Sequence, residues 1–392
     1  MPPSVAPPPR VRADACPGVL APHDAADGAL ARIRLPGGVL TAAAARAVAD
    51  CAQHHGDGAA HLTSRGNLQL RGLRRDDPAA LSVLVDAGLV PSRTHERVRN
   101  VLASPLSGIA GGLADVRGLA ARLDAAVCAS APLAGLSGRF LFALDDGRGD
   151  VAAEAPDLCW RARTATSGTL LVAGTPVGSV ALADAVDVLV HAAEAFLALG
   201  SSGAWRAAEV DGAPAHLAAA VLGNERHGEA TERRDCADRR PGVGDVLRDD
   251  GGRALVIAPV LGELAADDLR LLARLAPEVL VTPWRTIVLP CGGDAGALAA
   301  AGFAVDADSP ATLVSACAGS PGCAKSLADV RSHARTIIVD TQTRTHVVGC
   351  GRRCGAPHGA HRSLVARADG SYDTEVVSGD GRRSQGSSGR TA

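Results

Sequence analysis

Four cysteines near the C-terminal end of this 392-residue chain form two pairs, Cys317-x5-Cys323 and Cys350-x3-Cys354, which are separated by 26 residues. Four thiolates at this spacing predict a [4Fe–4S] cluster, which accepts and passes single electrons. Glycines and a proline interrupt the pairs, and glycine lets backbone amides turn toward cluster sulfurs. These residues are Ser320, Pro321 and Gly322 in the first pair, and Gly349, Gly351 and Gly355 around the second. The sequence therefore favours a redox enzyme.

Three other interpretations of the cysteines compete with a cluster. Structural zinc sites usually show Cys-x2–4-Cys spacing, which the x5 pair does not match. Disulfides need an oxidising compartment, and the N-terminus MPPSVAPPPR has neither an apolar export segment nor a cleavage pattern. Unrelated buried thiols are the third alternative. The remaining cysteines are scattered singly, as core thiols usually are: Cys16, Cys51, Cys128, Cys159, Cys236 and Cys291.

A second chemically informative stretch is the segment 61–71. Its polar residues recur with period two, so on a strand they would share one face, whereas Leu62, Leu68 and Leu70 would point to the core. The polar set is Thr63, Arg65, Asn67, Gln69 and Arg71. Because arginine binds carboxylates bidentately, this face suits a ligand rich in carboxylates. The alternative is the solvated face of an ordinary amphipathic strand.

Further arginines extend this pattern, namely Arg97, Arg99 beside Asn100, Arg139 and Arg285. A polycarboxylate macrocycle such as a tetrapyrrole would need several such groups. Each of them could equally be a surface salt-bridge partner that contributes little to stability.

Composition limits the possible classes of protein. The hydrophobic share is 47%, the aromatic share only 2% and the formal net charge −2, which argues against a broad nucleic-acid surface. Apolar runs fall short of the roughly 20 residues that span a bilayer. We therefore expect a soluble, cytoplasmic protein with two or three lobes, without nucleic-acid or membrane partners.

The elements that position these residues occur as a strand–helix–strand unit found twice. We expect strands at 29–35 and 60–70 around a helix at 42–54 capped by Thr41, and strands at 254–259 and 279–289 around a helix at 265–275. Each second strand carries a threonine followed by an arginine, Thr63 and Arg65 or Thr282 and Arg285. This weak duplication would place Arg65 and Arg285 on facing sides of one cavity.

Outside the two copies the alternation continues, so the expected fold class is α+β. We expect strands at 139–144, 169–172, 336–340, 345–348 and 363–367, and a helix at 324–335. The highly charged segment 225–241 is predicted to be a solvated connector.

Several of these motifs resemble the sirohaem-dependent sulfite and nitrite reductases, which contain duplicated ferredoxin-like half-domains. The cysteine pairs, the Thr63–Gln69 segment and Arg99-Asn100-Val101 match that pattern. Within this superfamily the chain is most similar to the precorrin-3B synthase family, over about residues 14–375. The matching stretches are 15–19, 27–28, 33–38, 62–72, 280–290 and 316–331.

One departure separates the members of the superfamily. The reductases carry a Lys-x-Lys pair that protonates and binds a small oxyanion, and the matching positions here are Arg139 and Leu141. Replacing the second cation by leucine removes a source of charge and protons from a sulfite pocket. The sequence therefore disfavours a sulfite reductase.

The resemblance implies a pseudo-twofold architecture with a [4Fe–4S] lobe. Its expected segments are disordered tails at 1–13 and 378–392, ferredoxin-like halves at 14–75 and 241–300, and catalytic halves at 76–240 and 301–377.

The resemblance also implies an activity. The expected reaction is O2-dependent C-20 hydroxylation of precorrin-3A with γ-lactone formation, in aerobic cobalamin biosynthesis; the alternative is sirohaem-dependent sulfite or nitrite reduction. The cofactors it implies are the [4Fe–4S] cluster, a mononuclear non-haem iron and NADH as ultimate reductant. Because the chain has no Gly-rich dinucleotide fingerprint, a separate reductase would deliver the electrons.

The roles implied for individual residues complete these expectations. Arg65, Arg99 and Arg139 are the expected catalytic residues, and the cysteines of the two pairs the expected metal ligands. Substrate binding is expected from Thr63, Arg65, Asn67, Gln69, Arg71, Arg99, Asn100 and Arg285. Two histidines and a carboxylate often hold non-haem iron, and the open candidates are His61, His346, His358, His361 and Cys16.

Overall fold

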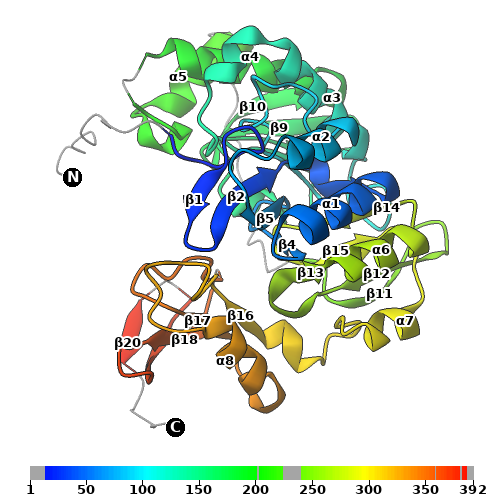
Figure 1. Ribbon diagram of the computed structural model, residues 1–392. Coiled ribbons are helices and arrows are strands. Elements are labelled where there is room, and N and C mark those ends of the chain that lie inside the picture. Colours follow the sequence, from blue (N-terminus) through cyan, green and yellow to red (C-terminus); the bar gives the residue numbers. More distant parts are fainter. Residues whose placement is uncertain (1–13, 201–202, 224–239, 358, 380–381, 386–392) are drawn as a thin grey trace.

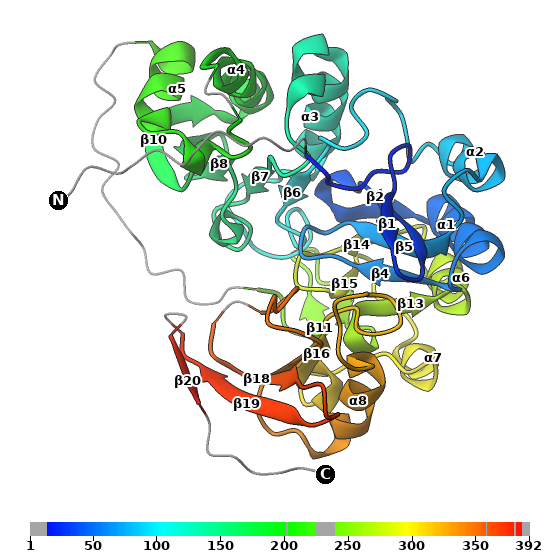
Figure 2. The same ribbon diagram turned by 60° about the vertical axis from the view of Figure 1, so that its left-hand side comes forward.

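The computed structural model describes residues 14–200, 203–223, 240–357, 359–379 and 382–385 (Figure 1). Four five-stranded sheets organise these residues. Figures 1 and 2 show two of the sheets, with their helices, in the middle of the molecule and the other two on either side of them. Within this part of the chain, none of the helices has the length and apolar character needed to cross a membrane.

The two central sheets are built from the two strand–helix–strand copies. The first copy comprises β1 (His23–Ala25), β2 (Gly28–Ile33), β3 (Val39–Thr41), α1 (Ala42–His55), β4 (Ala59–Leu62) and β5 (Leu68–Leu73). The second comprises β11 (Gly244–Leu247), β12 (Arg253–Ile257), β13 (Glu263–Ala265), α6 (Ala266–Leu275), β14 (Glu278–Val281) and β15 (Ile287–Leu289). The expected duplication is therefore confirmed.

One strand of each copy pairs with the sheet of the other copy. Strand β13 pairs with β4 and strand β3 pairs with β14, which gives the sheet orders β1-β2-β5-β4-β13 and β11-β12-β15-β14-β3. Residues of α1 and α6 are buried in one hydrophobic cluster that also includes strands of both sheets. The two copies consequently share a core and pack as one unit.

The predicted cap of helix α1 is confirmed, but the prediction of a single strand at 60–70 is wrong. Thr41 caps the helix, since its Oγ accepts a hydrogen bond from the amide of Ala44 at 3.2 Å. The segment 59–73 is a hairpin in which residues 63–67 turn between β4 and β5, and Gly66 adopts a φ of 61°. The strand expected at 279–289 is a hairpin for the same reason, with Arg285 at a φ of 60°.

The two outer sheets repeat one topology as well. One contains β6 (Val101–Ala103), β7 (Phe142–Asp145), β8 (Leu158–Ala162), β9 (Ser167–Val172) and β10 (Thr175–Ala181). The other contains β16 (Val314–Ala316), β17 (Thr345–Val348), β18 (His361–Ala366), β19 (Tyr372–Val377) and β20 (Arg383–Gln385). In each sheet the first three strands run parallel to one another, and each of the last two strands is antiparallel to the strand before it.

Helices at equivalent positions support this second duplication. Helix α3 (Arg117–Ala129) connects β6 to β7, and α8 (Val330–Ile337) connects β16 to β17. The pentapeptide Leu-Ala-Asp-Val-Arg precedes or enters both helices, at 113–117 and at 327–331. The other helices are α2 (Pro78–Asp86), α4 (Ala185–Ala198), α5 (Ala213–Leu222) and α7 (Ala295–Ala300).

Three expected elements differ from the structure. Residues 336–340 are not a strand, because α8 extends to Ile337 and a 3-10 turn occupies Ile338–Asp340. Helix α8 begins at Val330 rather than 324, where Asp329 caps it by accepting from the amide of Ser332. The predicted C-terminal tail contributes strand β20, whereas the predicted tail at 1–13 and residues 225–239 of the connector lie outside the described residues.

Candidate active site

A cavity of about 590 Å³ lies where the first central sheet meets the cysteine-bearing lobe. Strand β2, the β4–β5 hairpin and the start of β13 form one wall, and the loops after β16 and β17 form the other. A volume of this size falls within the range of small-molecule and cofactor sites. Two of the predicted metal ligands, Cys317 and Cys354, are part of its wall.

The parallel strands β16 and β17 bring the four paired cysteines together. Both strands end at the same edge of the sheet, and the two cysteine loops follow them. The pKa of the Cys354 thiol is raised by burial and by the charges of Cys317, Cys350 and Cys323, so these three thiols lie within electrostatic reach of Cys354. The amide of Gly349 also donates to the Cys317 sulfur at 3.4 Å.

The spacing of these sulfurs bears on the choice of metal. A tetrahedral zinc site would hold its sulfurs about 3.8 Å apart, given Zn–S bonds of about 2.3 Å. Among the described residues, the cysteines do not form a group whose sulfurs all lie within 4.8 Å of one another. The described cysteines are therefore not arranged as a compact tetrahedral zinc site, and four thiols on glycine-rich loops are the donor set that a [4Fe–4S] cluster uses.

Three arginines of the cavity wall form ion pairs with two carboxylates. Arg71 forms a bidentate pair with Asp27 at 2.8 and 3.0 Å, and it also donates to the carbonyl of Gly322 in the first cysteine loop. Arg331 and Arg335 both donate to Glu263, at 2.6 and 3.0 Å. These contacts tie the central sheet to the cysteine-bearing lobe.

Two other arginines of the wall keep their positive charge uncompensated. Within the described part of the chain, neither Arg32 nor Arg285 forms an ion pair. The Nε atom of Arg32 is buried without a hydrogen-bond partner, and Arg285 reaches only the carbonyl of Gly355, at 3.4 to 3.5 Å. Burial lowers the pKa of both guanidinium groups, because desolvation disfavours the charged form. The cavity therefore offers two cationic groups to an anionic ligand.

The structure brings together some of the predicted substrate residues. Thr63, Gln69, Arg71 and Arg285 all line the cavity. Leu62, Leu68 and Leu70 are buried in the core as predicted. The cavity is therefore formed by residues from both copies of the duplicated unit, and Arg285 faces it from the second copy.

The other predicted substrate residues have structural partners instead. Asn67 is buried in the hairpin turn, where it accepts from the amide of Leu35 at 2.8 Å and donates to the side chain of Asn100 at 3.3 Å. Asn100 donates in turn to the carbonyl of Gly138 at 2.9 Å. Both asparagines thus join the hairpin to the first outer sheet.

The expected catalytic arginines also lie outside the cavity wall. Arg65 donates to the carbonyl of Gly138 at 3.2 Å, and Arg99 forms a buried pair with Asp124 at 2.7 Å. Arg139 is exposed, with its guanidinium 4.8 Å from the ring centre of Trp205. Because their guanidinium groups are used elsewhere, the structure does not gather these three arginines around one reacting atom.

Sequence reasoning missed Arg32, Asp27 and Glu263. Arg32 has a signal, since Arg32 and Arg34 lie at period two in the strand before Pro36-Gly37-Gly38. The two carboxylates have none, because their partners are 44 residues away for Asp27 and 68 or 72 residues away for Glu263.

The residues predicted as possible ligands of a mononuclear iron lie in different environments. His61 lines the cavity, with Asp57 at 3.3 Å and Glu263 at 3.9 Å. His346 is buried, and its pKa is lowered to about 4 by burial and by the charge of Arg285. Its two ring nitrogens contact the Ser315 hydroxyl at 2.9 Å and the Cys354 carbonyl at 3.2 Å.

The remaining candidates do not complete a ligand set. His361 contacts the carbonyl of Gly359, the amide of Cys16 donates to Asp14, and His358 lies outside the described residues. Among the residues that the structure describes, two histidines and a carboxylate do not come close enough to form a compact metal site.

The position that distinguishes the reductases lies in an apolar environment. The side chain of Leu141 is only 3% exposed and packs with Leu102, Ala143, Val151 and Cys159, while its amide donates to Asp157 at 2.8 Å. A lysine here would bury a charge among aliphatic side chains. The apolar environment agrees with the leucine in the sequence.

Comparisons with known proteins agree with this architecture. The family model for the nitrite/sulfite reductase ferredoxin-like half domain matches residues 23–83. A curated relative, precorrin-3B synthase of Sinorhizobium sp., is 26% identical over 389 residues, covering 92% of this chain and 82% of the relative. Ferredoxin–nitrite reductase of Leptolyngbya laminosa is 40% identical over 97 residues, which is 24% of this chain and 19% of the reductase.

A solved structure extends the similarity of fold to nearly the whole chain. The NirA protein of Mycobacterium tuberculosis superposes with a TM-score of 0.74, covering 91% of this chain and 77% of that chain at 20% identity. At this identity the likeness establishes the fold alone. The α+β fold expected from the sequence is therefore confirmed.

Proposed function

We propose that this chain, a homologue of precorrin-3B synthase along most of its length, is an oxidoreductase that catalyses the same reaction. The reaction would be O2-dependent hydroxylation of precorrin-3A at C-20, with closure of a γ-lactone. The observation that carries the proposal is the extent of the relationship, 92% of the chain, against the 24% matched by a nitrite reductase. The cavity supplies independent physical support.

The cavity suits a tetrapyrrole with several carboxylates. Arg32 lies on the wall formed by the first central sheet, and Arg285 lines the cavity from the β14–β15 turn, beside Gly355; neither has a carboxylate partner among the described residues, so each would gain from an anionic substituent on the substrate. Arg71, Arg331 and Arg335 already have partners, and we propose that they fix the walls relative to each other. The substrate would thus be held by groups from both copies of the duplicated unit.

The paired cysteines would hold a [4Fe–4S] cluster next to this cavity. A bound cluster supplies electrons one at a time, and Cys317 and Cys354 belong to the wall that the substrate would contact. Activation of O2 by two electrons and two protons yields one oxygen atom for the substrate and one water molecule. We propose that NADH is the ultimate donor, through a separate reductase.

The proposed mononuclear iron has no ligand set among the described residues. We therefore derive no step that depends on it, and we keep His61 as the candidate nearest the cavity because it lines the wall beside Asp57. The alternative function is sirohaem-dependent sulfite or nitrite reduction. It would need a second cation at position 141, where this chain has Leu141, buried among apolar residues.

The decisive experiment is incubation of the purified protein with precorrin-3A, 18O2 and a reductant under single-turnover conditions. A product that contains one 18O atom supports the proposal, and a product without added oxygen contradicts it. The visible spectrum separates the alternative, since sharp haem-type bands in the red would indicate sirohaem.

Two sets of variants test the assigned groups. Arg32→Ala and Arg285→Ala should each weaken precorrin-3A binding about 10- to 100-fold, as expected for loss of a charged hydrogen bond of about 1.5–3 kcal/mol. Arg139→Ala, which removes an exposed guanidinium outside the cavity, is the control. Cys350→Ala should abolish the cluster absorbance, whereas Cys128→Ala should leave it intact.

A further inference from the structure

The first outer sheet contains a position equivalent to the cysteine cradle. Residues Ala103 and Leu144 pair across β6 and β7 as Ala316 and Val347 pair across β16 and β17. The next residue in each case, Ser104 or Cys317, donates its amide to the carbonyl of that partner, at 3.0 Å in both sheets. Ser104 therefore stands where the second half has its first cluster cysteine.

The second loop obeys the same equivalence. The amide of Leu113 donates to the carbonyl of Asp146, and the amide of Leu327 donates to the carbonyl of Gly349. Both leucines begin the repeated Leu-Ala-Asp-Val-Arg segment. The loop 146–151 thus corresponds to the loop 349–354, which carries the other cysteine pair.

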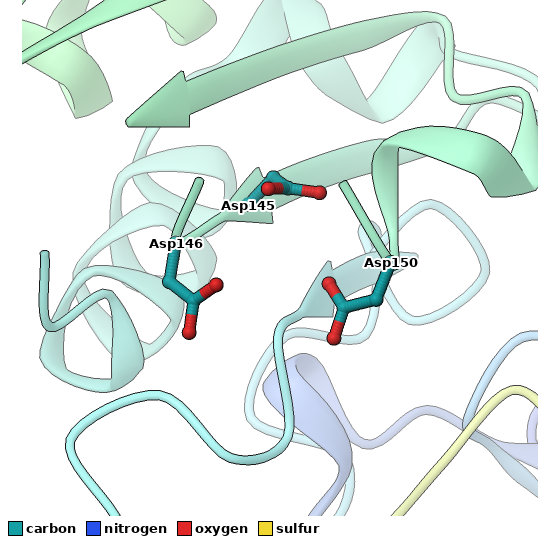
Figure 3. A group of neighbouring side chains, drawn as sticks. All are labelled: Asp145, Asp146 and Asp150. Carbon is teal, nitrogen blue, oxygen red and sulfur yellow. The ribbon is translucent and has the colours of Figure 1, made fainter. Parts of the chain in front are cut away.

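In place of thiols, this equivalent site contains three buried aspartates. Figure 3 shows Asp145 at the end of β7 and Asp146 and Asp150 on the loop that follows. The exposed fractions are 0% for Asp145 and Asp146 and 2% for Asp150. Each aspartate offers one carboxylate oxygen to a group whose members all lie within 4.8 Å of one another.

Protein donors fix two of the carboxylates. Asp145 accepts from the amides of Gly147, Gly149 and Ala152, at 2.8 to 3.0 Å. Asp146 receives Arg148 in a bidentate arrangement, with a shortest distance of 2.7 Å. These contacts leave the orientation of both groups well defined.

Asp150 is different because half of its carboxylate has no partner. Its Oδ1 atom accepts from the Ser104 hydroxyl at 2.6 Å and from the amide of Val151 at 2.7 Å. Its Oδ2 atom is buried without any hydrogen-bond partner. An unsatisfied buried carboxylate oxygen is costly and points to a ligand.

The charge balance indicates the kind of ligand. The nearest cations are Arg148 on Asp146 and Arg161, whose Nε lies 3.9 Å from Asp145, so three carboxylates face two guanidinium groups. The buried cluster is therefore short of positive charge. A cation of oxygen-ligand preference would supply it.

We propose that Asp145, Asp146 and Asp150 form a binding site for a divalent, oxygen-preferring cation of the Ca²⁺ class. Ca²⁺ takes clustered carboxylate oxygens in flexible geometry, whereas Mg²⁺ usually keeps several waters, which side chains only 0–2% exposed do not favour. Carboxylates are also the hard donors that such ions select, in contrast to the thiols of the equivalent site. The duplicated fold thus carries a cluster cradle in one half and an oxygen-ligand cation site in the other.

The test is Ca²⁺ titration of the full-length protein after dialysis against EGTA, followed by calorimetry and thermal unfolding. We expect one Ca²⁺ per chain, and a roughly 100-fold decrease in the unfolding equilibrium constant at a Ca²⁺ concentration 100 times the Kd. Asp150→Asn should weaken Ca²⁺ binding at least 10-fold. Since it removes a buried unpaired charge, this variant should be no less stable than the wild type without Ca²⁺.

Two further variants keep the test decisive. Asp245→Asn, at a carboxylate that is 61% exposed, should bind Ca²⁺ as the wild type does. Arg148→Gln removes the guanidinium that competes for Asp146, so it should bind Ca²⁺ more tightly. The proposal is overturned if the wild type does not respond to Ca²⁺, if Asp150→Asn responds equally, or if Arg148→Gln binds more weakly.

Discussion

Arg71 provides the sharpest test of how the cavity is held together. Its guanidinium is 8% exposed, pairs bidentately with Asp27, and donates across the interface to the carbonyl of Gly322 in the first cysteine loop. The Asp27 contact lies within the central sheet, so it persists when the cysteine loop opens. Only the hydrogen bond to Gly322 is lost on opening.

The size of the expected effect follows from the hydrogen bond between Arg71 and the Gly322 carbonyl. A hydrogen bond from a charged donor contributes about 1.5–3 kcal/mol, and a value near 2 kcal/mol corresponds to a factor of about 30 in an equilibrium constant. Arg71→Met keeps the buried aliphatic stem and removes the donor. The variant should therefore open the cysteine loop about 30 times more often than the wild type.

Amide hydrogen exchange of the peptide that spans residues 317–328 measures this opening directly. The amide of Ser320 donates to the carbonyl of Ala328 at 3.0 Å within the same lobe, so its exchange reports local opening of the loop that Arg71 holds at Gly322. Release of iron from the proposed cluster to an anaerobic chelator is a second readout and should accelerate in parallel.

Arg75→Met is the matched control. Arg75 pairs with Asp24 beside the same hairpin, but the two side chains are 49% and 74% exposed, and such surface pairs contribute about 0–1 kcal/mol. Exchange at Ser320 should change less than about 5-fold in this variant. The reasoning is refuted if Arg71→Met exchanges within 3-fold of the wild type, or if Arg75→Met matches it.

Three other predictions concern the fold and the chemistry. Gly38 has a φ of 76°, and a Cβ there would meet a backbone carbonyl of β14 at 2.1 Å. In chemical unfolding, Gly38→Ala should therefore lower the free energy of unfolding by more than about 2 kcal/mol. Gly58→Ala is the control: its φ is 88° but the space around it is open, so the loss should be about 1 kcal/mol. Burial raises the pKa of the Asp157 carboxyl despite its ion pair with Arg206. Above about pH 4 the unfolded state releases the proton of this carboxyl while the folded state still holds it. The free energy of unfolding therefore falls as the pH rises through the pKa of the folded state. Arg206→Gln should raise that pKa further and cost about 3 kcal/mol at pH 8 but less at pH 5, and equal losses at the two pH values would contradict this. Leu141→Lys should lower the melting temperature without conferring six-electron reduction of sulfite; measurable sulfide production would count against our assignment.

Local chemistry determined much of the fold from the sequence. Thr41 caps its helix, and Leu62, Leu68 and Leu70 are buried, because a cap and a strand face each depend on neighbouring residues. The hairpin turn at 63–67 was missed because the period-two pattern continues with the same phase on both sides of it. Only Gly66 marked the reversal, and glycine also occurs within strands.

The sequence by itself determined the cysteine pairs, the duplication of the central unit and the presence of many arginines. Tertiary structure alone decided which arginines remain available. Arg71 is neutralised by Asp27, Arg99 by Asp124, and Arg331 by Glu263, so Arg32 and Arg285 are left to face the cavity. The physical reason is that a carboxylate neutralises a guanidinium over a few ångströms of space, whatever their separation along the chain.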